Sequence, residues 1–175
     1  MTVDQFVIEL ISESTEQPVR ELIRRNLEGY EEAGTVIAAT FRRLANILPV
    51  YQNEGARYFV LKDTSKGNIC IGGAGIGSFH GLPPSEKLGE VRDLVLDLHY
   101  RGQGLGARLL KRCVEEAKTL GYRSLYLETT PKMENAQKLF MRFGFRPVIL
   151  ASSSPAKTSS TPQQVPSYYI LEKLA

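Results

Sequence analysis

The sequence predicts one domain of the mixed α/β (α+β) class, and three observations support this prediction. Its 175 residues exceed the length of about 150 at which a chain normally buries a self-sufficient core. Hydrophobic residues make up 42% and charged residues 23%, as in ordinary globular proteins. Segments with the two-residue period of strands alternate with segments that have the period of helices. We therefore expect about seven strands and about four helices in a single domain over residues 1–175.

The first quarter of the chain predicts one strand and two helices. Loosely alternating residues indicate the strand over Gln5–Ile11. Thr15 is of a type that caps helices, and apolar residues at helical spacing follow it, so we expect a helix over Glu16–Tyr30. Gly34 separates it from a second helix. That helix is expected to stop at Pro49, because proline lacks the backbone donor and clashes with the preceding turn.

A hairpin is expected next. Its strands are predicted over Arg57–Lys62 and Asn68–Phe79, around the turn residues 63–67. The glycine run Gly72–Gly77 lies within the second strand and has two interpretations, a phosphate cradle or a close approach of other groups to the backbone. Inside a strand the close approach is the commoner cause, so we expect tight packing there.

The strand predicted over Glu90–Leu98 has a conflicting pattern. Leucines occupy every second position from Leu94, which indicates one core-facing side. Glu90 and Arg92 fall on that same side, although charged residues are rarely buried in a core. Either a bulge kinks the strand, or its early half leaves the core and lines a cleft. We prefer the cleft.

The amphipathic pattern from Leu105 to Ala117 predicts a helix, and Gly121 fits its left-handed C-terminal cap. Residues 151–167 are rich in serine and proline and are expected to form a loop. The other elements predicted in this half are a strand over Ser124–Thr130, a helix over Glu134–Phe143, a strand containing Phe145, and a closing strand over Tyr168–Leu174.

Composition and motifs exclude several classes of function. The net charge of +3, without a long Lys/Arg run, argues against nucleic acid as a partner. No run of about 18 apolar residues and no signal peptide is apparent, so we expect no membrane partner. Cys70 and Cys113 match no zinc spacing and are expected to be reduced thiols in a cytoplasmic protein. His80 and His99 form no His-Glu-x-x-His site, so we expect no metal.

The loop over Arg101–Gly106 is the first candidate site. A glycine-rich turn between a strand and a helix exposes the first backbone N–H groups of the helix, and these groups together with the helix dipole favour an anion. No Ser, Thr, Asp or Asn stands at the helix start to cap these groups. Basic residues at Arg108, Lys111 and Arg112 add positive charge nearby. The glycines alone would also suit a turn with no ligand.

The wider pattern resembles a known family. A strand over Glu90–Leu98, Arg101-x-x-Gly104-x-Gly106, an amphipathic helix, a strand over Leu125–Thr129 and the sequence Asn135-Ala136-x-x-Leu139-Phe140-x-x-x-Gly144-Phe145 together resemble the GNAT superfamily of acyl-CoA-dependent N-acetyltransferases. The resemblance is strong over Gly89–Pro147 and weaker in the first half, which agrees only in the order of elements. It implies a central, twisted, mixed and mostly antiparallel sheet, and transfer of an acetyl group from acetyl-CoA to a primary amine in a ternary complex.

The resemblance also implies which residues bind acetyl-CoA. The loop would hold the pyrophosphate, the preceding strand would pair through its backbone with the pantetheine arm, and an asparagine of the later helix would reach the coenzyme. The residues so implied are Val95, Leu96, Arg101, Gly102, Gln103, Gly104, Leu105, Gly106, Ala107 and Asn135. Many relatives pair as dimers, which implies a homodimer. The acceptor is expected to be a small molecule such as an amino acid or amine.

For catalysis the resemblance suggests a base but no proton donor for the leaving thiolate. Some family members use as their base a glutamate eleven residues before the loop's first residue, and Glu90 has that spacing to Arg101. The alternative is an exposed strand-edge carboxylate paired with Arg92. Phe140 stands where many members have the tyrosine that protonates the leaving thiolate, and phenylalanine cannot donate a proton. Tyr126, Tyr168, Tyr169 or water would have to replace it.

Other functions stay open. Because of Phe140, the chain could instead be an acyl-CoA-binding sensor without turnover. Gly102-x-Gly104-x-x-Ala107 also fits a dinucleotide fingerprint, but too few strand–helix units follow it. A P-loop is excluded, since no Gly-Lys-Ser/Thr occurs. An interaction module that recruits partners through residues 151–167 has no recognisable motif to support it.

Overall fold

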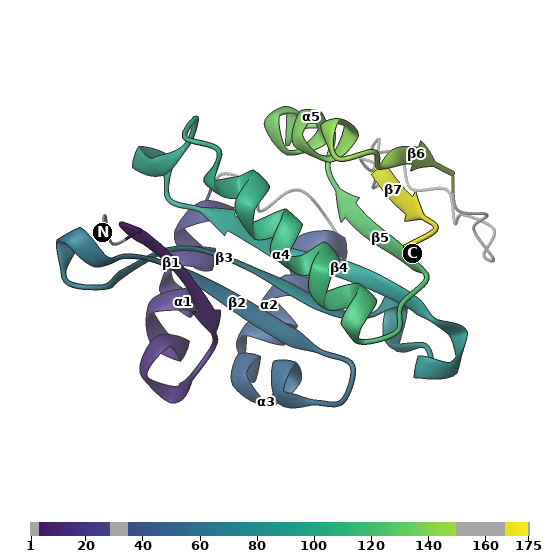
Figure 1. The fold of residues 1–175 in the computed structure, drawn as a ribbon, viewed down its shortest axis with the longest axis horizontal. Helices are drawn as coiled ribbons and strands as arrows, with labels where there is room; N and C mark the ends of the chain where they lie inside the picture. Colours follow the sequence, from purple (N-terminus) through teal and green to yellow (C-terminus); the bar gives the residue numbers. More distant parts are fainter. Residues whose placement is uncertain (1–3, 29–34, 150–166, 175) are drawn as a thin grey trace, which may run out of the picture.

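A computed structural model of the protein describes residues 4–28, 35–149 and 167–174. Its strands form one seven-stranded sheet in the order β1-β2-β3-β4-β5-β7-β6, in which only β4 and β5 are parallel neighbours (Figure 1). The mixed, mostly antiparallel sheet confirms the predicted fold class. The strands are β1 (Phe6–Leu10), β2 (Arg57–Asp63), β3 (Ile69–Ser78), β4 (Leu88–Leu96), β5 (Ser124–Thr129), β6 (Arg146–Val148) and β7 (Ser167–Glu172).

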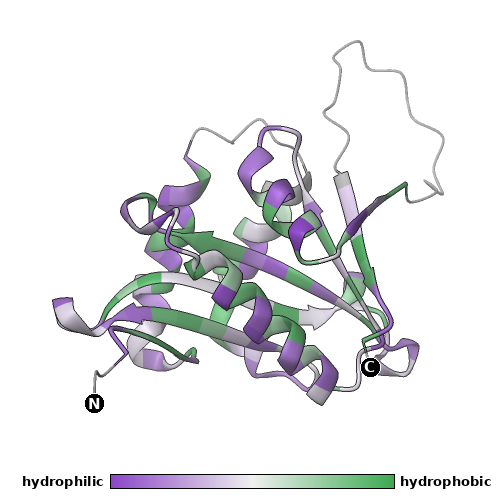
Figure 2. Ribbon diagram, turned by 45° about the horizontal axis from the view of Figure 1, so that its top comes forward, coloured by the Kyte–Doolittle hydropathy of each residue, from purple (hydrophilic) through white to green (hydrophobic). Residues whose placement is uncertain are grey.

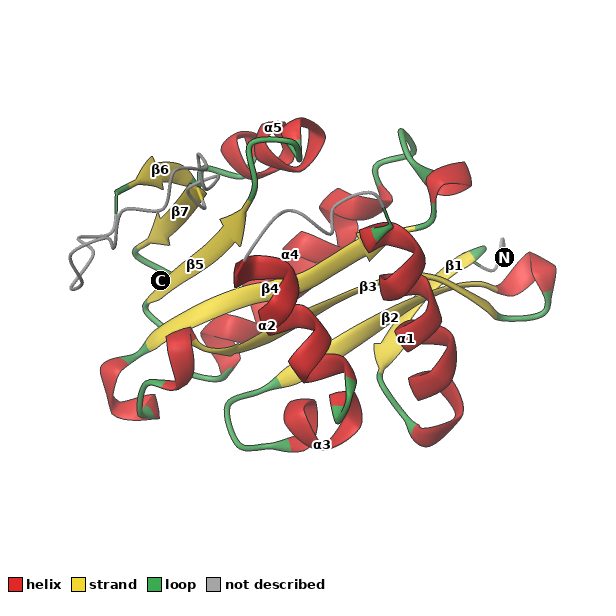
Figure 3. Ribbon diagram, turned by 180° about the vertical axis from the view of Figure 1, so that it is seen from behind, coloured by secondary structure: helices red, strands yellow, loops and turns green. Residues whose placement is uncertain are grey.

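Helices cover both faces of the sheet. The described helices are α1 (Glu13–Leu27), α2 (Thr35–Leu44), α3 (Ile47–Gln52), α4 (Leu105–Thr119) and α5 (Glu134–Arg142). In Figure 1 α4 lies in front of the sheet, whereas the view from behind in Figure 3 shows α1, α2 and α3 in front. The central strands carry mostly hydrophobic residues, as Figure 2 shows. Each face therefore buries its own core, one beneath α4 and α5 and the other beneath α1 and α3. No helix in the described ranges is long and apolar enough to cross a membrane.

Three predicted helix limits differ from the structure. Helix α1 ends at Leu27, with Glu28 as its C-cap, whereas the predicted end Tyr30 lies outside the described residues. Helix α1 begins at Glu13, because Ser12 is its N-cap and the Thr15 hydroxyl accepts a hydrogen bond from the Ser12 N–H at 2.9 Å. The second predicted helix is two helices, and Pro49 lies in the first turn of α3 rather than ending it. Proline is tolerated there because the first N–H groups of a helix have no partner within the helix. The five described α-helices thus exceed the predicted four by one.

The glycine run of β3 makes the close contacts that its position in a strand predicted. A Cβ atom at Gly73 would overlap the Tyr58 ring, and one at Gly75 would overlap the Tyr51 ring. Both tyrosines are buried against this strand, in the core beneath α1 and α3. The predicted loop at 151–167 falls on residues that the structure does not describe, except for Ser167, which begins β7.

A bulge in β4 resolves the conflicting pattern of that strand. Gly73 pairs with Val95 and Gly75 with Arg92, so that β4 contributes one extra residue. Asp93, inside the bulge, has φ +53. Val91 and Leu94 consequently pack toward α4, whereas Val95 joins the core on the other face. The bulge and the cleft that we preferred are both present. Leu98 lies outside the strand, which ends at Leu96, and is 68% exposed.

Candidate functional site

Strands β4 and β5 separate beyond Val91. Their pairing runs from Leu88 with Ser124 to Val91 with Leu127, and β4 then continues to Leu96 without a β5 partner. Figure 1 shows the two strands diverging. The Asp97 N–H donates to the Ile71 carbonyl of β3, so the neighbouring Leu96 N–H faces away from β3, toward the gap. Beyond Val91 this edge of β4 therefore has no described strand as a partner, although the Leu96 carbonyl there accepts a hydrogen bond from Arg101 Nε at 3.3 Å.

The end of β5 carries two buried threonine hydroxyls. Thr129 and Thr130 are each 2% exposed at the end of this strand. Neither hydroxyl has a hydrogen-bond partner among the residues that the structure describes. Buried hydroxyls normally have partners, so these two are exceptions within the described part of the chain.

The N-terminus of α4 is open, as predicted. Gly104 is its N-cap, no side chain caps it, and the Arg108 N–H is the first of the helix to bond back, to the Gly104 carbonyl at 3.1 Å. Gly102 and Gly104 have φ +77 and +76, and a Cβ atom at either would meet nothing within 4 Å. The first backbone N–H groups of α4 therefore have neither a partner within the helix nor a side-chain cap among the described residues, an arrangement that binds phosphate groups.

The predicted basic residues around this loop are partly engaged elsewhere. The Arg101 guanidinium donates to Asn26 Oδ1 at 2.9 Å and to the Leu96 carbonyl at 3.3 Å. Arg108 pairs with Asp4 at 2.9 Å. Arg112 bonds Glu116 at 3.2 Å. These side chains brace the loop and helix, so the backbone N–H groups are the clearest anion-binding feature. Asn135, also predicted to reach the coenzyme, is exposed in the first turn of α5.

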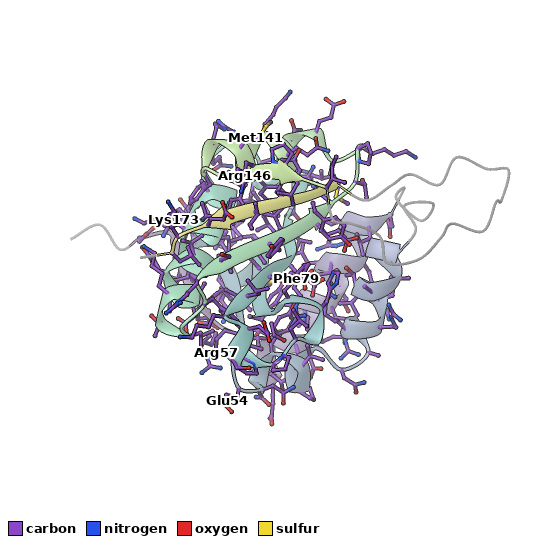
Figure 4. The ribbon with its side chains drawn as sticks, turned by 90° about the vertical axis from the view of Figure 1, so that its right-hand side faces the viewer. Glu54, Arg57, Phe79, Met141, Arg146 and Lys173 are labelled. Carbon is purple, nitrogen blue, oxygen red and sulfur yellow. The ribbon has the colours of Figure 1, made fainter. Side chains whose placement is uncertain are left out.

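A cavity of about 400 Å³ lies between β4 and α2. Glu90 to Asp93 of β4 form one wall, and the gap follows on the same strand. Phe79 stacks on His80 of the cavity lining, and Figure 4 shows it between the strands and the helices of the N-terminal half. The lining residues are Ala39, Thr40, Arg42, Arg43, His80, Gly81, Glu90, Val91, Arg92, Asp93, Glu128 and Tyr168.

Glu90 faces this cavity and is nearly buried. Its side chain is 9% exposed, and its Oε2 lies 3.9 Å from Arg92 Nη1. Burial raises the pKa of Glu90, although the positive charges of Arg92 and Arg43 oppose the shift. Of the alternative prediction, an exposed strand-edge carboxylate paired with Arg92, the exposure and the edge position were wrong, because β4 lies between β3 and β5 at Glu90. The pairing with Arg92 is present. The burial that a carboxylate needs in order to act as a base near neutral pH is present.

Asp93 ties the bulge to two helices, which sequence reasoning missed. Its carboxylate is 1% exposed and accepts two hydrogen bonds from Arg43 of α2, at 2.8 and 2.7 Å. Thr40 donates to the same group at 3.1 Å, and the Tyr51 hydroxyl of α3 donates to it as well. The network fixes the bend of β4 between the gap and the cavity.

His80, Glu128 and Tyr168 complete the cavity and were not predicted as site residues together. One ligand atom each of His80, Glu90 and Glu128 lies within 4.8 Å of the others. The Tyr168 hydroxyl donates to Glu128 at 3.1 Å. Burial and Glu128 raise the pKa of Tyr168 to about 12. A sequence signal existed for Glu128, because Tyr126 and Glu128 alternate with core leucines in β5. None existed for His80.

Phe140 is buried in the core and 5% exposed. Its ring lies 6.2 Å from those of Phe145 and Tyr169. The Tyr169 hydroxyl donates to Gln137 of α5 at 3.3 Å, which leaves it on the same face of the sheet as Phe140. Tyr168 lines the cavity instead, and Tyr126 stacks on Phe79. Of the three tyrosines proposed as substitutes, Tyr169 lies beside Phe140.

Comparison with known proteins gives consistent matches. A sequence model described as the acetyltransferase (GNAT) family matches residues 17–145. The uncharacterized N-acetyltransferase YjgM of Escherichia coli (strain K12) is 29% identical over 102 residues, which are 58% of this chain and 58% of that protein. Glucosamine 6-phosphate N-acetyltransferase 1 of Oryza sativa subsp. japonica is 32% identical over 81 residues, 45% of this chain and 49% of that protein. The chain thus spans about half the length of these relatives.

Solved structures show the same fold. The structure of yncA from Salmonella typhimurium with its cofactor acetyl-CoA superimposes with a TM-score of 0.73 at 18% identity. The superposition covers 97% of this chain and 94% of that one.

Proposed function

This chain belongs to the acetyltransferase (GNAT) family, and we propose that it transfers an acetyl group from acetyl-CoA to a primary amine of a small acceptor, directly and in a ternary complex. The observation that carries the proposal is the position of the gap and the cavity. Both border β4, the cavity at Glu90–Asp93 and the gap from there to Leu96. An acceptor bound in the cavity and acetyl-CoA bound in the gap would meet at the bulge of β4.

Acetyl-CoA is proposed to occupy the gap and the open end of α4. When bound, it supplies a thioester whose carbonyl carbon an amine can attack. The pantetheine arm would lie along β4 at Val95 and Leu96, with its backbone hydrogen bonds made by Leu96, because the Val95 backbone faces β3. The loop with Arg101, Gly102, Gln103, Gly104, Leu105, Gly106 and Ala107 would hold the pyrophosphate. Asn135 would contact the coenzyme from α5.

Glu90 is proposed as the base. An aliphatic ammonium has a pKa near ~10 and is not nucleophilic until it loses a proton. Glu90 faces the cavity, and burial raises its pKa toward the range in which a carboxylate removes protons efficiently. The Leu96 N–H, free on the gap side, would donate to the thioester oxygen as that oxygen gains negative charge.

The absence of a tyrosine at Phe140 is compatible with turnover. A thiol of pKa ~8.5 leaves tolerably well as a thiolate near neutral pH. Of the three candidate tyrosines, Tyr126, Tyr168 and Tyr169, only Tyr169 lies beside Phe140, so it is the nearest alternative proton donor.

The cavity favours a small acceptor. Its volume of about 400 Å³ falls in the range of about 300–1,000 Å³ found for small-molecule sites. A cytoplasmic location, which the free thiols Cys70 and Cys113 support, and a homodimer stay predictions of the same proposal. The absence of nucleic-acid and membrane partners is likewise a prediction.

The rival candidate is an acyl-CoA sensor, which Phe140 favours. Thiol release from acetyl-CoA, followed in the presence of a panel of amino acids and small amines, separates the two functions. An acetyltransferase releases thiol only with particular amines. A sensor binds acetyl-CoA, which calorimetry detects, and releases no thiol above the background with any amine.

A further inference from the structure

The His80 imidazole lies between a buried carboxylate and the solvent. Glu90 is nearly buried at the cavity wall, whereas His80 is exposed and lines the same cavity. Atoms of the two side chains lie within 4.8 Å of each other, a separation that one shift of either side chain or one water closes. An exposed titratable group therefore lies close enough to Glu90 to exchange a proton with it.

The position of this imidazole is fixed by its surroundings. His80 has φ +48 and ψ 30, a left-handed conformation that is uncommon for residues other than glycine. Its ring stacks on Phe79 with centroids 4.0 Å apart and an interplanar angle of 19°. Phe79 in turn stacks on Tyr126 of β5 at 4.3 Å. The aromatic stack holds the ring at the cavity although the backbone there is unfavourable, as is common at functional sites.

Charged groups from four strands and helices face this position. Glu128 of β5 lies within 4.8 Å of the imidazole, and Tyr168 of β7 orients its carboxylate through a 3.1 Å hydrogen bond. On β4 the neighbours are Glu90, Arg92 and Asp93; on α2 they are Arg42 and Arg43, of which Arg43 is paired with Asp93. Glu128 thus offers an anionic acceptor to a protonated imidazole, as the carboxylate does in a catalytic triad.

We propose that His80 is a second catalytic residue, which takes the acceptor's proton from Glu90 and releases it to solvent while Glu128 and Tyr168 position its ring. The proposal rests on the acetyltransfer proposed above. The acceptor ammonium gives one proton to Glu90, its nitrogen bonds to the acetyl carbon, and the carbon–sulfur bond breaks. The amine's second proton passes to the leaving thiolate, directly or through water. Glu90 then returns to its carboxylate form by giving its proton to His80. Each turnover yields the acetylated amine, the free thiol and one proton.

His80→Asn tests the role, with His99→Asn as the matched control. Asparagine tolerates the left-handed conformation better than most residues, so the variant removes the imidazole and keeps the backbone. His99 is the chain's other histidine and its side chain is 90% exposed, outside the cavity lining. Steady-state kinetics are measured from acid to alkaline pH, with and without added imidazole and with and without EDTA.

The proposal predicts that His80→Asn lowers kcat by at least ~10-fold with an unchanged KM for acetyl-CoA, and that added imidazole restores part of the rate. His99→Asn should behave as the wild type. An unchanged kcat in His80→Asn overturns the proposal, and so does a loss that imidazole does not rescue, because the residue would then be structural. Activity lost in EDTA and restored by zinc would assign the three groups to a metal instead. If the wild type itself releases no thiol with any amine, the proposed acetyltransfer fails, and the role of His80 fails with it.

Discussion

Neutralising Asp93 is predicted to destabilise the protein strongly. In Asp93→Asn the side chain keeps its shape and its tolerance of the positive φ, but it loses the charge that accepts two hydrogen bonds from Arg43. The NH2 group of asparagine would replace one of the two carboxylate oxygens and would then face hydrogen-bond donors. In the wild type Oδ1 accepts from Thr40 and Arg43, and Oδ2 accepts from Tyr51 and Arg43. Breaking one partner of a buried ion pair costs about 3–5 kcal/mol.

The matched control is Glu172→Gln, which removes one charge from the ion pair with Arg146. That pair is on the surface, with side chains 59% and 49% exposed, and is expected to contribute at most about 1 kcal/mol. Urea denaturation of both variants measures the two free energies of unfolding. With a slope of about 2 kcal/mol per M, Asp93→Asn should lower the midpoint by roughly 2 M. Equal shifts in the two variants would refute the idea that the Asp93 network holds β4 to α2 and α3.

Three further predictions follow. Glu90→Gln should lower kcat by about 10²–10⁴-fold while leaving acetyl-CoA binding intact, and the loss should shrink toward pH ~10, where the amine deprotonates by itself; an unchanged pH–rate profile would remove Glu90 as the base. Gly106→Val should raise the dissociation constant for acetyl-CoA in calorimetry with little change in Tm, because a Cβ there meets only Leu139 at 3.4 Å but would stand at the proposed pyrophosphate site; unchanged binding would place the coenzyme elsewhere. Hydrogen bonds from Ser65, Tyr100 and Gln5 lower the pKa of Asp63 from 3.8 to about 2, so the stability that its carboxylate contributes is complete above about pH 4 and is lost as the pH falls through 2. Asp63→Asn should therefore lower the Tm near neutral pH and make the Tm depend less on pH between pH 5 and 2. A variant whose Tm falls with pH in parallel with that of the wild type would contradict this.

Most of the fold could be predicted from the sequence because its periodic patterns are local. The α4 helix follows from the spacing of its leucines, and the hairpin of β2 and β3 from its turn residues. The errors arose where two local rules compete. Ser12 and Thr15 are both capping types, and the structure uses them together. Pro49 ends a helix interior but is tolerated in a first turn.

Part of the candidate site could also be predicted from the sequence, and part could not. The open loop at Gly102 and Gly104 could be predicted because its residues are contiguous in the chain, whereas Glu90 was selected by its eleven-residue spacing to Arg101 in the family resemblance. The meeting of His80, Glu90 and Glu128 could not, because it depends on the register of β4 with β5 and on a left-handed residue after β3. The Asp93 network depends on a bulge that reverses which residues of β4 face each core.

The central claim is that an amine bound in the cavity attacks acetyl-CoA held in the gap. Quantifying both products by mass spectrometry, with both substrates varied and an amine selected from the panel, tests it most directly. We expect equal amounts of N-acetylated amine and free coenzyme A, with intersecting initial-rate lines, because both substrates must be bound before transfer. Thiol release without acetylated amine, or parallel lines that indicate an acetylated enzyme, would contradict it.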